Sequence, residues 1–454
     1  MRRRILGDTL RRNLWFRPAL WVITLGLLAL ILTATDRRIG QHELYNDAPW
    51  LFHGGADGAR AMLGAIAASM LTVATLAYSI VMLAVVQAAN AYSPRILREY
   101  LADPAQQDVL GILMGTFLYN LLVLRVVRAT ERASFVPSLS VNVALLLLLL
   151  SIGAFIFFIH HVAHSIEVRH IVGILQAEAK GLLAEVFPEG LGTPWPGDEP
   201  PAVPDGVPGV IAAADGGYVQ FIDPDGLLEA VMRAGVVARL ERTTGDYVLP
   251  GMPLAAIWPA EAVTADLRGT LREAFRLGQE RTPVQDLHFA LRQLSDIALR
   301  AISPAVNDPS TAVNCIDVLA TVLVELARRP PVSPHRCGPD GRLRVIARGP
   351  TLETALEQAF QQVRHYAATD LACTVRLIEA LGEIGLAAAS PSARAALWRH
   401  VGMVARSADR HLDEPHDRAT NNDRLTRAAQ MLGQDVRPLL LPLTAPESAI
   451  QATP

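Results

Sequence analysis

The chain has 454 residues, of which 51% are hydrophobic and 19% are charged, and its formal net charge is −3. This length predicts two or three domains, and the near-neutral charge argues against nucleic-acid binding, which requires a basic face. The three cysteines, Cys315, Cys337 and Cys373, form no CxxC pair, so neither a disulfide framework nor a zinc ribbon is expected. Reduced thiols fit a cytosolic location for this part of the chain.

Four long segments in the first third of the chain lack charged residues. They lie between Arg17 and Asp36, Arg60 and Arg95, Asp108 and Arg125, and Arg132 and Glu167. About 20 mostly apolar residues suffice for a helix to cross a bilayer. We therefore expect a transmembrane region over residues 18–165, with helices near 18–36, 61–90, 108–127 and 138–164, followed by a water-soluble region.

The basic segment 1–17 bears on the topology. Its six arginines precede an apolar run from Pro18 to Thr35, which is the plan of a signal sequence. The run is long for a signal peptide, however, and Thr33-Ala34-Thr35 is a poor cleavage site. We expect an uncleaved first helix with residues 1–17 in the cytosol, and four crossings then return the C-terminus to the cytosol.

The second predicted helix carries a row of hydroxyl groups. Ser69, Thr72, Thr75 and Ser79 recur at steps of three or four residues, so they share one helical face. Such a face is typical of close helix packing. The alternative is a polar path through a bundle or oligomer, because hydroxyls replace part of an ion's hydration shell without the cost of a buried charge.

The third predicted helix contains the GxxxG motif of Gly111 and Gly115. This motif favours helix packing, although alone it is not specific. Tyr119 and Asn120 follow at the depth of the membrane, and we expect Asn120 to face protein because an amide is costly against lipid.

The fourth predicted helix ends in a histidine cluster. His160, His164 and Glu167 are four and three residues apart, a spacing that can hold a transition metal ion. Two alternatives stay open, an interfacial histidine cluster at the end of a membrane helix and a proton sensor.

A stalk and linker over residues 166–209 leads to a small β module at 210–258. The stretch GDYVLPGMPLAAIW resembles the hammerhead repeat of biotinyl/lipoyl-like barrels. In those barrels the cofactor is attached to a lysine, but the only lysine here is Lys180. We therefore expect a barrel-like structural or adaptor module without lipoyl or biotin attachment, and no cofactor is predicted elsewhere.

Residues 259–408 follow a helical pattern and predict a helical cytosolic domain, and residues 409–454 predict a largely disordered tail. Thr282 to Gln285 reads as a capping box, and Asp308-Pro309 as a second helix start. Asp296, Arg300, Asn307, Asp308 and Asp317 form a polar cluster in the sequence. They can be helix caps and an ion pair at a tight corner, or a ligand site.

No catalytic signature is present: the sequence has no GxSxG, GxxxxGK or HExxH motif, and no GxGxxG after a strand. We therefore expect no enzyme.

Four segments instead resemble a broad family of bacterial predicted membrane proteins, catalogued as a domain of unknown function. They are ASMLTVATLAYSIVMLAVVQAANAYSPRIL, GILMGTFLYNLLVLRVVR, FIFFIHHVAHSI and DIALRAISPAVNDPSTAVNCID. The resemblance runs from the first helix to about residue 400. It implies a bacterial inner-membrane protein with a cytosolic C-terminal region, and it supplies neither an activity nor functional residues.

Three hypotheses follow. The first is a homo-oligomeric channel or transporter for ions or small solutes, lined by the second helix and gated by the cytosolic domain. The second is a membrane-anchored sensor or scaffold without a transport path. The third is a metalloenzyme that uses His160, His164 and Glu167.

Overall fold

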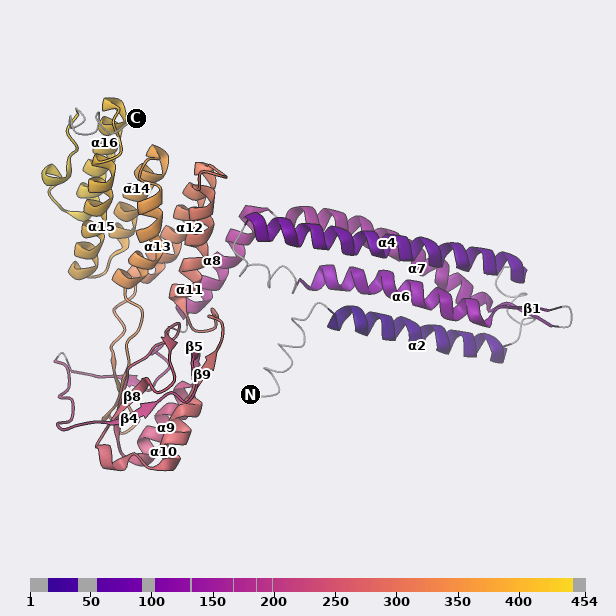
Figure 1. Ribbon diagram of the computed structural model, residues 1–454, viewed down its shortest axis with the longest axis horizontal. Helices are drawn as coiled ribbons and strands as arrows, with labels where there is room; N and C mark the ends of the chain where they lie inside the picture. Colours follow the sequence, from indigo (N-terminus) through magenta and orange to yellow (C-terminus); the bar gives the residue numbers. More distant parts are fainter. Residues whose placement is uncertain are drawn as a thin grey trace. The chain divides into compact units, whose positions relative to one another are not determined.

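The computed structural model describes residues 15–39, 55–91, 103–130, 133–165, 167–184, 186–197 and 199–443. Most of the basic N-terminus, the SPRIL segment at 93–97 and residues 444–454 lie outside the described residues. The chain divides into two compact units, Met1–Ile171 and Val172–Pro454 (Figure 1).

Among its described residues, the first unit is a bundle of four long helices, and each apolar segment of the sequence supplies one of them. The helices are α2 (Phe16–Ile39), α4 (Ala56–Ala91), α6 (Pro104–Val126) and α7 (Ser138–Ser165) (Figure 1). Helix α6 is central because it contacts α2, α4 and α7. A short hairpin of β1 (Arg128–Thr130) and β2 (Ala133–Phe135) joins α6 to α7.

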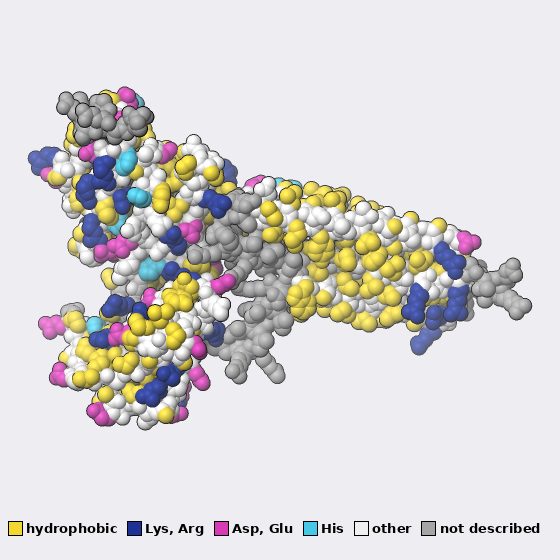
Figure 2. All heavy atoms as spheres, viewed as in Figure 1, with side chains coloured by type: hydrophobic (Ala, Val, Ile, Leu, Met, Phe, Trp, Pro, Cys, Tyr) yellow, Lys and Arg dark blue, Asp and Glu magenta, His cyan; other side chains and the backbone are white. Residues whose placement is uncertain are grey.

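The outer surface of this bundle is apolar. Leu83, Leu149 and Ile156 are 63%, 66% and 65% exposed, and hydrophobic side chains cover most of the visible bundle in Figure 2. Water would penalise so much exposed apolar surface, whereas the hydrocarbon of a bilayer does not. Helix α6 begins at Pro104, earlier than the charge gap suggests, because the Asp103 carboxylate accepts a hydrogen bond from the Ala105 N–H and caps the helix.

Five described helices are long and apolar enough to cross a membrane. Four form the first unit, and the fifth is α12 (Pro309–Ala327) in the second unit. Helix α12 packs against other helices of its own unit, and its burial there accounts for its apolar composition.

The boundary between the units falls within α8 (Val168–Ala184), and a β region follows this helix in the second unit. One sheet has six strands in the order β3-β10-β11-β6-β8-β4, and a second has three in the order β7-β5-β9. Helices α9 (Pro224–Ala234) and α10 (Ala265–Ala274) and the 3-10 helix η1 (Ala260–Ala262) belong to the same region. The strands are β3 (Thr193–Pro194), β4 (Gly209–Ala212), β5 (Gly217–Ile222), β6 (Val237–Leu240), β7 (Tyr247–Val248), β8 (Pro253–Trp258), β9 (Phe275–Gly278), β10 (His335–Cys337) and β11 (Leu343–Ile346).

The barrel expected for residues 210–258 is not confirmed, because the strands of this segment divide between two sheets and pair with strands from outside it. Val345 of β11 pairs in parallel with Ala238 of β6, and β5 pairs with β9. The buried side chains of both sheets, α9 and α10 form one hydrophobic cluster.

Six helices follow in three hairpins. They are α11 (Leu287–Ala301), α12, α13 (Leu352–Tyr366), α14 (Leu371–Ala387), α15 (Pro391–Asp409) and α16 (Pro415–Leu432). Helix α13 packs between α11 and α15, and α14 packs between α12 and α16, so the hairpins stack in two layers (Figure 1). Stacking of this kind is typical of helical solenoids, in which each hairpin buries its apolar faces against its neighbours.

Two sequence predictions are wrong in this region. Thr282 does not begin a helix; α11 begins after Asp286, whose carboxylate accepts from the Phe289 N–H. The disordered tail predicted for residues 409–454 is wrong for residues 409–443, because α16 lies within them, as does the short helix η2 (Arg437–Leu439). The Arg418 guanidinium binds the carbonyl groups of Leu412 and Pro442 and holds the segment after α16 in place.

Candidate functional sites

The hydroxyl row of the second predicted helix lies on the outer face of α4. Ser69, Thr72, Thr75 and Ser79 are all exposed in the single chain. Three of them bond within their own helix, Thr72 to the Ala68 carbonyl at 3.0 Å and Thr75 and Ser79 to the carbonyls four residues earlier at 2.9 Å. The hydroxyls therefore form no path inside one subunit, and they face either lipid or another molecule.

The two glycines of the GxxxG motif lie against α2. A Cβ atom on Gly111 would fall 2.8 Å from Trp21 Cβ and 2.9 Å from the backbone of Pro18. A Cβ on Gly115 would fall 2.7 Å from Leu25 Cδ1. These contacts bring α2 and α6 together within one chain, which leaves the motif no free surface for contact between subunits.

The interior of the bundle contains polar contacts that the sequence did not predict. The Thr116 and Ser151 hydroxyls lie 3.0 Å apart, and the Tyr119 hydroxyl donates to the Ser140 carbonyl at 2.9 Å. Asn120 faces protein as expected and is fully buried; its amide nitrogen donates to the Thr116 carbonyl. The first two of these bonds join α6 to α7.

Asp36 caps the N-terminal end of α7. Its buried carboxylate accepts from the backbone N–H groups of Leu139 at 3.1 Å and Ser140 at 3.0 Å, and from the Ser140 hydroxyl. A carboxylate at a helix N-terminus satisfies free N–H groups and complements the helix dipole. Asp36 is therefore a cap for α7 that is supplied from α2.

Polar contacts gather at the end of the bundle where α6 begins. Arg17 donates twice to the Asp108 carboxylate, at 2.9 and 2.8 Å, and the Trp21 ring nitrogen donates to the same group at 3.0 Å. His161 lies 2.5 Å from the Asp103 carboxylate. These contacts tie α2 and α7 to the start of α6.

The predicted metal triad is not assembled. Among the described residues, no group of three His, Cys, Asp or Glu side chains is placed to hold a metal ion. The rings of His160 and His164 lie 4.2 Å apart, and His164 Nδ1 is 3.0 Å from the His160 carbonyl oxygen. Glu167 lies beyond the end of α7 at Ser165.

Members of the predicted polar cluster of the second unit cap helices and form ion pairs with residues outside the cluster. Asp308 caps α12 by accepting from the Thr311 N–H and hydroxyl, and these bonds lower the pKa of its carboxyl. Asp296 pairs with Arg292 one turn earlier on α11, at 2.7 Å. Arg300 lies in the last turn of α11, and Asn307 takes a left-handed backbone conformation, with φ of 50°, just before α12.

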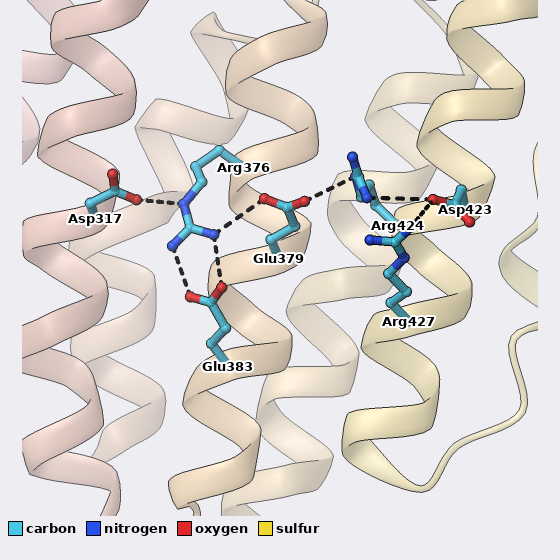
Figure 3. Close-up of polar contacts among 7 residues, drawn as sticks. All are labelled: Asp317, Arg376, Glu379, Glu383, Asp423, Arg424 and Arg427. Carbon is cyan, nitrogen blue, oxygen red and sulfur yellow. Dashed lines mark hydrogen bonds and ion pairs between the residues drawn. The ribbon is translucent and has the colours of Figure 1, made fainter.

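Asp317 belongs instead to an ion-pair network across α12, α14 and α16 (Figure 3). Arg376 pairs with Asp317, with Glu383 at 2.8 Å and with Glu379 at 3.2 Å. The hydrogen bond to Glu383 is the largest of the causes that raise the pKa of Arg376. Glu379 also pairs with Arg424, Arg424 pairs with Asp423, and Asp423 pairs with Arg427. A network of this kind joins three successive hairpins and has no evident reactive group.

The cysteines are poor nucleophiles. All three are buried as free thiols, and burial raises the pKa of Cys315 and of Cys373 to about 12. The thiolate is the reactive form, so these side chains have the character of core residues.

The fold and these sites together define a class: a membrane protein with several long apolar helices and a large β and helical region downstream. The chain belongs to the family described as "Predicted membrane protein (DUF2254)", which matches residues 11–383. It is 31% identical over 441 residues to uncharacterized proteins of Mycobacterium bovis and of two strains of Mycobacterium tuberculosis, covering 95% of this chain and 83% of each relative. No solved structure matches the chain.

Proposed function

We propose that the protein is a homo-oligomeric channel or transporter of the bacterial inner membrane. In this proposal α2, α4, α6 and α7 cross the membrane, both termini are cytosolic, and the α4 helices of several subunits surround a polar path for ions or small solutes. The second unit gates the path, and no catalytic step is involved.

The outward direction of the α4 hydroxyls carries the proposal. Along the same exposed face, Ala61, Ala65 and Ala68 precede Thr72, so small and hydroxyl-bearing residues extend over several turns. A face in contact with lipid has no need of small residues, whereas close helix contacts favour them. Hydroxyls and the carbonyls that accept from them also suit a partly dehydrated cation.

Thr72→Leu and Ser79→Leu are expected to abolish flux of potassium or sodium ions in proteoliposomes while leaving the oligomer intact. Each change replaces a polar group on the proposed path with an apolar and bulkier side chain. The measurement is ion flux reported by an ion-sensitive dye, with oligomer size followed by native mass spectrometry.

Thr24→Leu is the matched control. Thr24 is an exposed threonine on α2, and its hydroxyl donates to the Leu20 carbonyl at 2.8 Å, the same arrangement as in α4. It should leave flux unchanged. If flux in the two α4 variants equals that of the unsubstituted protein, α4 does not line the path.

A second candidate, a membrane-anchored sensor or scaffold, is favoured by the two-layered helical array. Stacked hairpins present extended surfaces to which partners bind, and such binding requires no transport path through the membrane. A purified protein that is monomeric in lipid and conducts no ions would favour this candidate.

A further inference from the structure

Helices α13 and α15 lie side by side in one layer of the helical array, and an ion pair between Glu353 and Arg399 joins them. Arg364 lies eleven residues after Glu353, and Arg410 lies eleven residues after Arg399. Eleven residues make about three full helical turns. Arg364 therefore lies on the same face of α13 as Glu353, and Arg410 continues the face of α15 that carries Arg399. The charge of Arg410 also contributes, after burial, to the lowered pKa of Arg364, as expected for two arginines at the same level of neighbouring helices.

Arg406 lies one turn before Arg410 and joins the same group. In the part of the chain that the structure describes, none of the three has an ion pair, and Arg364 Nε is buried without a hydrogen-bond partner. Burial and then the nearby charges of Arg410 and Arg406 lower the pKa of Arg364. The side chain of Arg364 is half-buried, while Arg406 and Arg410 are exposed, so the group opens to solvent.

Three neighbouring guanidinium groups repel one another. Helix carbonyls offset part of this cost, because Arg364 and Arg406 lie in the last turns of their helices, where a cation interacts favourably with the helix dipole. An anion would offset the rest. The planar donor fork of arginine matches the oxygens of a phosphate and binds them through charge-assisted hydrogen bonds.

We infer that Arg364, Arg406 and Arg410 form a binding site for a phosphate group. The group can belong to a soluble phosphate ester or to the headgroup of a phospholipid, since both present the same oxygens. Arginine and histidine side chains are prominent on the visible surface of the helical array (Figure 2). The inference does not depend on the proposed transport path.

The test uses the full-length protein in dodecyl maltoside, which contains no phosphate, and measures binding of inorganic pyrophosphate by calorimetry at fixed ionic strength. Arg364→Gln and Arg410→Gln should each weaken binding by about tenfold or more, the loss expected for one charge-assisted contact. Without pyrophosphate, both variants should melt at or above the temperature of the unsubstituted protein, because each relieves repulsion. That result separates a binding role from a structural one.

Arg394→Gln is the control, because it makes the same charge change at an exposed position near the start of α15 and should alter binding less than about twofold. Absence of pyrophosphate binding, or equal binding in all variants, would overturn the inference. A second arm uses nanodiscs with and without phosphatidic acid. If pyrophosphate binds more weakly in nanodiscs with phosphatidic acid than in those without it, the lipid headgroup competes for the site and is its occupant. If binding is the same in both, the occupant is a soluble phosphate. Both results support the site.

Discussion

Arg418→Met is expected to destabilise the helical array by about 3 kcal/mol or more, because it leaves several backbone carbonyl groups without a donor and each buried acceptor without a partner costs about 1–3 kcal/mol. The Arg418 side chain has no exposed surface. Its guanidinium donates to the Asp409 carboxylate at 2.7 Å and to the backbone carbonyl groups of Asp409, Leu412 and Pro442. Methionine fills much of the volume but donates no hydrogen bond, so these carbonyls lose their partner.

The measurement is thermal melting of the purified protein, together with limited proteolysis of the segment after α16. Arg418→Met should lower the melting temperature and expose this segment to protease. Arg427→Met is the control on the same helix, since Arg427 is 57% exposed in its ion pair with Asp423 and such pairs contribute about 0–1 kcal/mol. Equal effects of the two substitutions would show that Arg418 does not hold the segment.

Gly111→Leu is expected to separate α2 from α6 and to lower the stability of the bundle by at least the roughly 1–3 kcal/mol typical of overpacking. The atoms nearest to a new Cβ include the Pro18 backbone, which cannot rotate away. The helices must therefore move apart, and the bonds from Arg17 and Trp21 to Asp108 at the same contact weaken. Gly111→Ala should have the same effect to a smaller degree.

Gly153→Leu tests whether this effect is specific to the contact. Gly153 lies exposed on α7, and no atom lies within 4 Å of the position that a Cβ would take there, so leucine should be tolerated. Melting of the detergent-solubilised protein should rank the variants in the order Gly153→Leu, Gly111→Ala, Gly111→Leu, from most to least stable. A tolerated Gly111→Leu would mean that α2 does not pack closely on α6.

The helices of the first unit can be predicted from the sequence because the prediction depends only on the length of a segment and on its lack of charged residues. A long segment without charge predicts an apolar helix whatever its neighbours are, and each of the four segments supplies one. The periodicity of Ser69, Thr72, Thr75 and Ser79 likewise predicts a shared face. It does not give the direction of that face, which depends on how α4 packs against α6 and α7.

The contacts between distant residues could not be predicted. Asp36 binds Ser140, 104 residues away, and nothing in either local segment indicates the other. The sheet poses the same problem, because β11 pairs with β6 across a sequence that includes α11 and α12. Helix starts depend on local residues, and even these are predicted with mixed success. Asp308-Pro309 correctly predicts the start of α12, whereas Thr282 to Gln285 has the pattern of a capping box although α11 begins only after Asp286.

The central claim is that α4 faces the α4 helix of another subunit rather than lipid. Disulfide cross-linking in native membranes tests it most directly. The cysteines Cys315, Cys337 and Cys373 are first replaced by alanine, and a single cysteine is introduced at Thr72 on α4 or at Leu149, which is 66% exposed on α7.

On oxidation with copper phenanthroline, the account predicts covalent dimers for Thr72→Cys and monomers for Leu149→Cys. Monomers for Thr72→Cys, and likewise for Thr75→Cys and Ser79→Cys, would contradict it, because the hydroxyl face of α4 would then lie against lipid.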